Sequence, residues 1–177
     1  MKDTKELKIM TDLPKGWMEC NGNIINDSDS PLNVVATLDF TLTKHEYMCK
    51  MTETVALKST CPRKHVGAIF VNQDYEILAT GYNSSPKGFP NCKDIGCLIE
   101  NGGCIRTAHA EMNAILQAAK RGTPLKNAIL YLTITPCVYC AKHLINLEIT
   151  EIRCKEEYRD KRGIEWLKTA KIKVSQW

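Results

Sequence analysis

The residues with the clearest chemical potential in this sequence are one histidine and two cysteines. His109 stands at the start of one stretch of helical periodicity, and Cys137 and Cys140 stand at the start of another. Because residues three apart share one face of a helix, the two thiolates can bind the same metal ion, and His109 can add a nitrogen ligand. Three protein ligands leave the fourth position of a tetrahedral zinc ion open to water, which is typical of catalytic zinc sites.

Glu111 lies just beyond His109 and is not needed as a ligand. Zinc lowers the pKa of bound water from ~15.7 to roughly 7, and a carboxylate beside that water can take its proton and transfer it to a leaving amine. The order His-x-Glu followed by Pro-Cys-x-x-Cys is the signature of zinc-dependent nucleobase deaminases. A Cys-x-x-Cys pair alone is also typical of zinc ribbons and redox sites. The combined pattern therefore favours a catalytic zinc centre.

The elements that must position these residues alternate between helices and strands. The run over 129–135 is continuously apolar, so we expect a central strand covered on both faces. A long loop over 83–105 is rich in Ser, Pro, Gly and Cys. This alternation predicts an α/β fold with a mixed sheet between helical layers. The predicted helices cover 44–57, 108–120, 136–146 and the first part of 160–174; the predicted strands cover 66–71, 76–82, 129–135, 150–155 and the end of 160–174.

The composition is ordinary for a globular protein, with 44% hydrophobic and 25% charged residues among 177. The longest apolar runs are too short to span a bilayer, and the N-terminus lacks the apolar segment of a secretory signal. A net charge of +4 without a concentrated basic patch suits a small anionic ligand and argues against stable DNA or RNA binding. We therefore expect a cytoplasmic protein with no membrane partner.

The first 42 residues differ in character from the rest. They are rich in polar and turn-forming residues, and one short apolar run at 34–38 predicts a strand. The remainder is long enough for one domain with a full core. We expect residues 1–42 to be an N-terminal appendage of unknown role and residues 43–177 to be a zinc-dependent deaminase domain.

From about residue 47 to the C-terminus, the chain resembles the deoxycytidylate (dCMP) deaminase family, phage and bacterial type, within the zinc-dependent cytidine deaminase superfamily. The resemblance implies the family's three-layer α/β/α sandwich with a five-stranded mixed sheet. It also implies hydrolysis of dCMP to dUMP and ammonia, a reaction that supplies dUMP for thymidylate synthesis. The matching segments are STCPRKHVGA at 59–68, TGYNSSPKG at 80–88, HAEMNAIL at 109–116 and YLTITPCVYCA at 131–141.

The resemblance also assigns residues to the substrate. Asn83 matches the asparagine with which superfamily members bind a sugar hydroxyl, and Tyr158 matches a family tyrosine near the substrate. Ala110, between the histidine and the glutamate, is placed at the substrate as well. From the residues alone, Asn83 also fits a turn at the end of a strand, and Tyr158 also fits an exposed loop.

Four further cysteines precede the helix that begins near His109, namely Cys61, Cys92, Cys97 and Cys104. Thiolates from a loop and a flanking segment can close a tetrahedral zinc site with no open position, the structural type. Phage and bacterial dCMP deaminases, which the chain resembles, carry an extra zinc around the same loop, although some hold it with a mixed Cys, His and Glu set. The alternative is a group of free buried thiols.

The resemblance further implies regulation. Many dCMP deaminases are hexamers that dCTP activates and dTTP inhibits at a separate site, with Mg²⁺ accompanying the triphosphate. Gly and Ser in the segment 81–88 let backbone N–H groups approach phosphate oxygens, and its lysine adds positive charge. One serine stands where many relatives have glycine, and a plain surface turn is the alternative. The effector-binding candidates are Asn83, Ser84, Ser85, Lys87 and Gly88.

Other functions fit the same residues. A tRNA adenosine deaminase shares the zinc motif, but the cysteine-bearing insertion before His109 and the absence of a dense basic face argue against it. A riboflavin-pathway deaminase is less favoured, since we expect no reductase domain to follow. A zinc-stabilised interaction module without activity belongs to a different class, and there Glu111 would have no chemical role.

Overall fold

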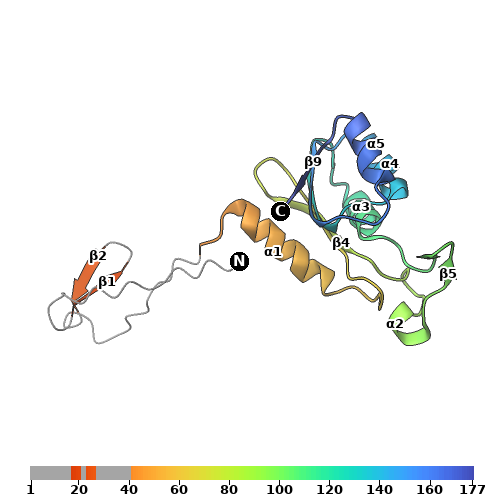
Figure 1. The fold of residues 1–177 in the computed structure, drawn as a ribbon, viewed down its shortest axis with the longest axis horizontal. Helices are drawn as coiled ribbons and strands as arrows, with labels where there is room; N and C mark the ends of the chain where they lie inside the picture. Colours follow the sequence, from red (N-terminus) through yellow and green to blue (C-terminus); the bar gives the residue numbers. More distant parts are fainter. Residues whose placement is uncertain (1–16, 21–22, 27–40) are drawn as a thin grey trace. The chain divides into compact units, whose positions relative to one another are not determined.

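The structure, a computed structural model, describes residues 17–20, 23–26 and 41–177. The chain divides into two units, Met1–Leu42 and Thr43–Trp177 (Figure 1). In the first unit, β1 (Trp17–Cys20) pairs antiparallel with β2 (Asn23–Asn26). The sequence pattern predicts mainly loops in this unit and does not predict these two strands. The strand expected over 34–38 lies outside the described residues.

The second unit contains a five-stranded mixed sheet with the strand order β4-β3-β7-β8-β9. Strand β3 is antiparallel to both of its neighbours, whereas β7, β8 and β9 run parallel. The predicted fold class is confirmed, and the nine predicted elements occur in the predicted order. The elements are α1 (Lys44–Ala56), β3 (Gly67–Val71), β4 (Ile77–Tyr82), α3 (Ala110–Arg121), β7 (Ile129–Ile134), α4 (Val138–Asn146), β8 (Glu151–Glu156), α5 (Arg162–Thr169) and β9 (Lys173–Gln176).

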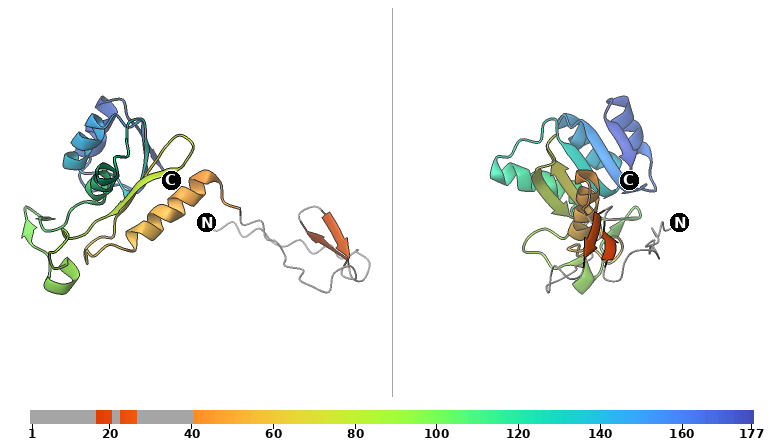
Figure 2. Two further views of the ribbon diagram at one scale, coloured as in Figure 1. Left: turned by 180° about the vertical axis from the view of Figure 1, so that it is seen from behind. Right: turned by 90° about the vertical axis from the view of Figure 1, so that its left-hand side faces the viewer.

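Three layers follow from the alternation of side chains along the central strands. Phe70 and Leu130 are fully buried in the core that includes α3, α4 and α5. Ile69 and Tyr131 point the other way and are fully buried in a second core with Met48 of α1. The three later helices therefore cover one face of the sheet and α1 covers the other (Figure 2). Burial on both faces explains why the sequence of β7 is continuously apolar.

Helix α1 begins at a capping box. The Thr43 hydroxyl accepts the backbone N–H of Glu46, and the Glu46 carboxylate accepts the N–H of Thr43 at 2.8 Å. The loss of such a cap typically costs about 1 kcal/mol. Among the described residues, no helix combines the length and apolarity that crossing a membrane requires.

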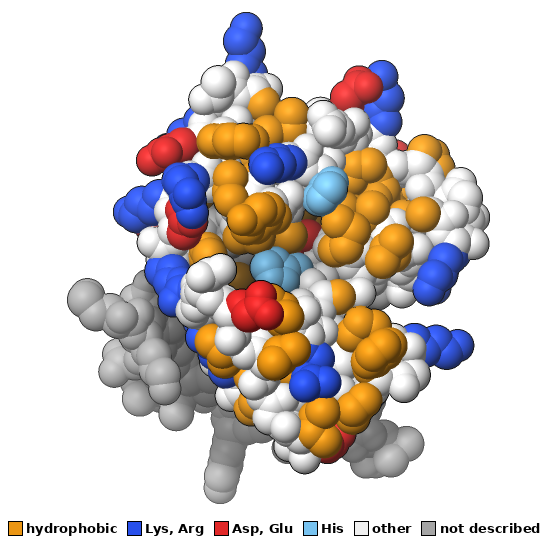
Figure 3. All heavy atoms as spheres, turned by 90° about the vertical axis from the view of Figure 1, so that its right-hand side faces the viewer, with side chains coloured by type: hydrophobic (Ala, Val, Ile, Leu, Met, Phe, Trp, Pro, Cys, Tyr) orange, Lys and Arg blue, Asp and Glu red, His pale blue; other side chains and the backbone are white. Residues whose placement is uncertain are grey.

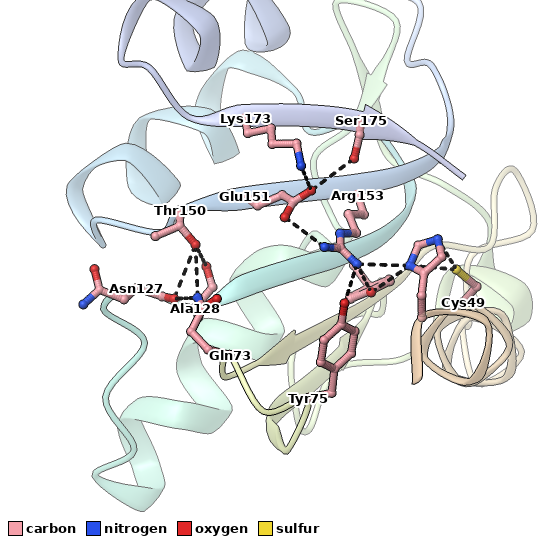
Figure 4. Close-up of polar contacts among 12 residues, drawn as sticks. Cys49, Gln73, Tyr75, Asn127, Ala128, Thr150, Glu151, Arg153, Lys173 and Ser175 are labelled. Atoms are coloured by element: carbon pink, nitrogen blue, oxygen red, sulfur yellow. Dashed lines mark hydrogen bonds and ion pairs between the residues drawn. The ribbon is translucent and has the colours of Figure 1, made fainter. Parts of the chain in front are cut away.

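A polar network ties α1 to the sheet on the face opposite α3 (Figure 4). The guanidinium of Arg153 on β8 donates to the hydroxyls of Tyr131 at 2.7 Å and Tyr75 at 3.0 Å. It also pairs with Glu151 at 3.0 Å. From α1, the Nδ1 atom of His45 lies 2.9 Å from the Tyr131 hydroxyl. One half-buried arginine thus links α1, the β3–β4 turn and two strands.

The segment between β4 and α3 is more ordered than the predicted loop. It contains a short helix, α2 (Cys92–Ile95), and a small antiparallel pair, β5 (Ile99–Glu100) with β6 (Gly103–Cys104). It then returns to the main sheet, where Ser84 and Ala108 form an isolated bridge. This return places the start of α3 beside the end of β4.

Candidate active site

The start of α3 carries the histidine and the glutamate. His109 is the N-cap residue and Glu111 lies in the first turn. This turn packs directly on β4, because a Cβ on Gly81 would overlap the carbonyl oxygen of Ala110 and lie 2.9 Å from the Cβ of Ala114. Glycine at this position therefore allows the helix start to approach the sheet closely.

The start of α4 carries the two cysteines. Cys137 is the N-cap residue and Cys140 lies in the first turn. Upstream, the backbone N–H of Thr135 donates to the carbonyl of Glu156 at 2.9 Å, and the Thr135 hydroxyl accepts the N–H of Tyr158 at 2.7 Å. The segment after β8 thereby holds the turn that presents Cys137.

The three predicted ligands come together. The Nδ1 atom of His109 lies 3.5 Å from the Sγ of Cys137 and 3.4 Å from the Sγ of Cys140. Tetrahedral zinc bonds of about 2.0 Å to nitrogen and about 2.3 Å to sulfur place those two atoms about 3.5 Å apart. The donor set and its spacing therefore fit a zinc ion bound through Nδ1 and two thiolates.

The charges in this cluster depend on one another. Hydrogen bonding from the Cys140 thiol, together with the His109 imidazole, lowers the pKa of Cys137 to about 4. The Cys137 thiolate in turn raises the pKa of His109 to about 9 and raises the pKa of Cys140. One thiolate forms readily, and a divalent cation is what allows the second thiolate and a neutral imidazole to coexist with it.

Glu111 is 4% exposed, and burial raises the pKa of its carboxyl group. A carboxyl group with a raised pKa holds a proton more readily, which suits a general acid–base. Its neighbour His109 is exposed at the surface. On the face that displays α2 and β5, histidine side chains reach the surface among many hydrophobic ones (Figure 3).

A second cluster contains three of the four other predicted cysteines, namely Cys92, Cys97 and Cys104. The Sγ atoms of Cys92 and Cys104 lie 3.7 Å apart, and tetrahedral zinc places two thiolates about 3.8 Å apart. Burial alone would raise the pKa of Cys104, but hydrogen bonding from the Thr107 hydroxyl lowers it to about 6. Cys61 is buried and is not a member of this cluster.

The residues expected at the substrate lie in different settings. Asn83 is 6% exposed; its side-chain oxygen accepts the backbone N–H of Val66 at 2.9 Å, and its amide donates to the carbonyl of Lys64 at 2.8 Å. The side chain of Ala110 is fully buried. Tyr158 is partly exposed beside Arg159, whose guanidinium carbon lies 5.9 Å from the centre of the Tyr158 ring.

The expected effector segment begins buried and ends exposed. Ser84 pairs with the backbone of Ala108, and its hydroxyl accepts the Asn113 amide at 3.3 Å. The Ser85 hydroxyl is buried without a hydrogen-bond partner in the part of the chain that the structure describes. Lys87 and Gly88 are exposed, and Gly88 has a φ of 88°.

Several residues at these sites carry no signal in the sequence. Thr107 contacts the second cluster, with its hydroxyl 3.3 Å from the Cys92 Sγ. Thr135 ties the turn before Cys137 to Tyr158, and Gly163 contacts the backbone of that turn. Their roles depend on contacts across the fold, so neither motif nor periodicity identifies them.

Known proteins share this sequence and fold. Residues 42–156 match the family described as the cytidine and deoxycytidylate deaminase zinc-binding region. ComE operon protein 2 of Bacillus subtilis is 44% identical over 65% of this chain and 60% of its own length. The deoxycytidylate deaminase of Saccharomyces cerevisiae is 34% identical over 74% of this chain and 44% of its own length. The chain thus spans roughly half the length of these curated relatives.

A solved structure extends the match. The crystal structure of dCMP deaminase from the cyanophage S-TIM5, in complex with dCMP and dUMP, superposes with a TM-score of 0.68 at 32% identity. The superposition covers 75% of this chain and 96% of the phage chain. The chain therefore belongs to the family of cytidine and deoxycytidylate deaminases that share this zinc-binding region.

Proposed function

We propose that this chain hydrolyses dCMP to dUMP and ammonia. The observation that carries the proposal is the cluster of His109, Cys137 and Cys140 at zinc-ligand spacing, with the buried carboxyl group of Glu111 beside it. The preference for dCMP is supported by relatives that are themselves dCMP deaminases, including the cyanophage protein crystallised with dCMP and dUMP.

A zinc ion at the first cluster supplies a Lewis acid that lowers the pKa of water to roughly 7. Glu111 accepts a proton from the attacking water and delivers it to the amino group on C4 of the cytosine. The C4–N bond then breaks, ammonia leaves, and the ring keeps the oxygen of the water. Burial raises the pKa of Glu111, which favours the protonated form that exists between the two proton transfers.

We place the sugar and base against Asn83, Ala110 and Tyr158. Although Asn83 already bonds two backbone groups, one amide hydrogen and one oxygen lone pair remain for a sugar hydroxyl. The same bonds fix the orientation of the amide, so a ligand meets a preorganised side chain. Residues 43–177 form the deaminase domain in this proposal, and residues 1–42 are an appendage without an assigned role.

We assign a second, structural zinc to Cys92, Cys97 and Cys104. A ligand set built from one loop would hold α2 and the β5–β6 pair together. Cys61 is left out of the set, and the fourth position remains unassigned.

Regulation by dCTP and dTTP with Mg²⁺, in a homo-hexamer, completes the proposal. Two observations support this: the Ser85 hydroxyl has no hydrogen-bond partner among the described residues, and Lys87 is exposed, so a triphosphate would offer acceptors to both. The protein would act in the cytoplasm, where thiols stay reduced, and would supply dUMP for thymidylate synthesis.

The test is ammonia release from dCMP, dCTP, cytidine, adenosine and a tRNA anticodon arm, with zinc measured on the same sample. We expect turnover of dCMP alone among these compounds. Turnover of the anticodon arm would instead identify a tRNA adenosine deaminase. A zinc-loaded protein that releases no ammonia from any of them would be an interaction module.

A further inference from the structure

The N-terminal end of α5 touches the turn that presents Cys137. A Cβ on Gly163 would overlap the carbonyl oxygen of Pro136 and lie 3.0 Å from the carbonyl carbon of Cys137. All of these neighbours are backbone atoms, which cannot rotate away as the end of a long side chain can. Any side chain at this position would therefore displace either α5 or the turn.

Hydrogen bonds hold this turn on both sides. The Thr135 backbone and hydroxyl bond to the segment after β8, at Glu156 and Tyr158. Downstream, the carbonyl of Cys137 accepts the N–H of Ala141 at 2.9 Å in the first turn of α4. Gly163 contacts this stretch between these two sets of bonds.

Helix α5 is also anchored. Leu167 is fully buried and Ile164 is 9% exposed, both in the first turns of the helix. Moving α5 outward would expose the apolar side chain of Leu167 to water, which is unfavourable. Within the turn, Cys137 is the N-cap residue and its side chain makes no capping hydrogen bond, so Cys137 is the part of the turn with the fewest restraints.

We infer that Gly163 is a positioning residue for the zinc ligand Cys137, an inference that rests on the metal site of the proposed function. The absence of a side chain lets α5 press against the Pro136–Cys137 backbone and sets the separation of Cys137 from His109. Replacement by alanine moves Cys137 away from the other two donors and weakens zinc binding at the first cluster, leaving the second cluster as it was.

The experiment compares Gly163→Ala with Gly67→Ala in the full-length, zinc-loaded protein. A Cβ on Gly67 would overlap the carbonyl oxygen of Thr52 and lie 2.8 Å from the backbone nitrogen of Ala56, so the steric overlap is similar to that at Gly163. It falls between α1 and β3, away from both cysteine clusters. Both variants should therefore unfold more easily, but only Gly163→Ala should lose zinc affinity at the first cluster.

Zinc occupancy is read residue by residue. Each protein is titrated with a chelator, cysteines that lose zinc are alkylated, and peptide mass spectrometry reports each site separately. The quantity compared is the chelator concentration at which half of the zinc has left a given pair of cysteines, the half-release point. For Gly163→Ala we expect this concentration to fall about 10–100-fold at Cys137 and Cys140, the usual loss of metal affinity when groups that orient the ligands are disturbed. The points for Cys92, Cys97 and Cys104 should stay within about twofold.

Two results overturn the inference. One is unchanged zinc release at Cys137 in Gly163→Ala, which would mean that α5 moves instead. The other is an equal loss in Gly67→Ala, which would trace the effect to general instability. If zinc does not protect Cys137 and Cys140 from alkylation even in the wild-type protein, the result contradicts the proposed function itself.

A milder variant covers the case in which Gly163→Ala does not fold. Thr135→Val removes the hydroxyl that accepts the Tyr158 N–H and so loosens the same turn without adding bulk. Earlier zinc release at Cys137 in this variant supports a positional requirement. Release identical to wild type overturns it.

Discussion

The Nδ1 atom of His109 lies 3.4 Å from the Sγ of Cys140, although 31 residues separate them in the chain. Each residue sits at the start of a helix, and both helices rest on the same face of the sheet. The two N-termini therefore meet, and their partial positive charges favour thiolates. This meeting point is what makes two short sequence motifs into one metal site.

The role of Glu111 is tested by Glu111→Gln. We expect turnover of dCMP to fall about 10²–10⁴-fold, because a positioned general acid–base is lost, while zinc content stays the same because Glu111 is not a ligand. Glu165→Gln is the matched control, since Glu165 also lies in the first turn of a helix but is exposed. Steady-state kinetics measure the turnover and elemental analysis measures the zinc content. Near-normal turnover in the zinc-loaded Glu111→Gln variant would contradict the proposed mechanism.

Zinc stoichiometry distinguishes the two clusters. The purified protein should contain two zinc ions per chain. Cys137→Ser should retain one ion and lose activity, whereas Cys97→Ser should lose the other and lower the melting temperature, since closed zinc sites contribute folding energy.

Cys61→Ser is the informative control for that experiment. Cys61 is buried near the loop but is not part of the cluster, so this variant should keep both ions. Loss of the second zinc on this change would restore Cys61 to the ligand set and show that the loop closes further than the structure has it. One zinc in fully active wild-type protein would contradict the second site altogether.

The Arg153 network predicts a pH-dependent contribution to stability. Burial alone would raise the pKa of Glu151, but the side chains of Arg153 and Lys173 lower it below its usual value. A carboxylate with a lowered pKa in the folded state stabilises the fold above its unfolded pKa of ~4.3, and this contribution is lost as the pH falls through the folded pKa.

Glu151→Gln should therefore lower the free energy of unfolding by about 1–3 kcal/mol at pH 7, and the difference from wild type should shrink as the pH falls below ~4. The control is Glu148→Gln, because the Glu148 side chain is 65% exposed in its pair with Lys126, against 12% for Glu151. Exposed pairs contribute little. Urea unfolding across this pH range gives the measurement, and a pH-independent difference would exclude the proposed ion pairs as its cause.

The sequence was sufficient where the determinants are local. Periodicity located nine of the helices and strands of residues 43–177 but not α2, β5 and β6. The short spacing of residues at helix starts made His109, Glu111, Cys137 and Cys140 candidates. The mixed sheet followed from the alternation of these elements.

Contacts across the fold could not be identified in this way. Nothing in the sequence links Gly163 to Pro136, Thr107 to Cys92, or Arg153 to Tyr131, because each pair meets only after the sheet has formed. The same limit explains Cys61: its position in the chain fits a ligand, but the fold places it outside the cluster.

Regulation is tested through the segment from Asn83 to Gly88. The buried Ser85 hydroxyl has no partner among the described residues, and the exposed Lys87 follows it closely. The backbone of this segment also pairs with the residue before His109, through the isolated Ser84–Ala108 bridge. A triphosphate bound here would thus contact a segment that is continuous with the metal site.

We expect dCTP with Mg²⁺ to raise dCMP turnover at low substrate concentration and dTTP with Mg²⁺ to lower it. The coupling should be about 1–3 kcal/mol, equivalent to roughly 5–150-fold in apparent affinity. Lys87→Ala should reduce both responses while leaving turnover without effector unchanged, whereas Lys93→Ala, at an exposed lysine of the same loop, should keep them. Hyperbolic kinetics that neither triphosphate alters would show an unregulated enzyme. A response that survives Lys87→Ala unchanged would move the effector site elsewhere.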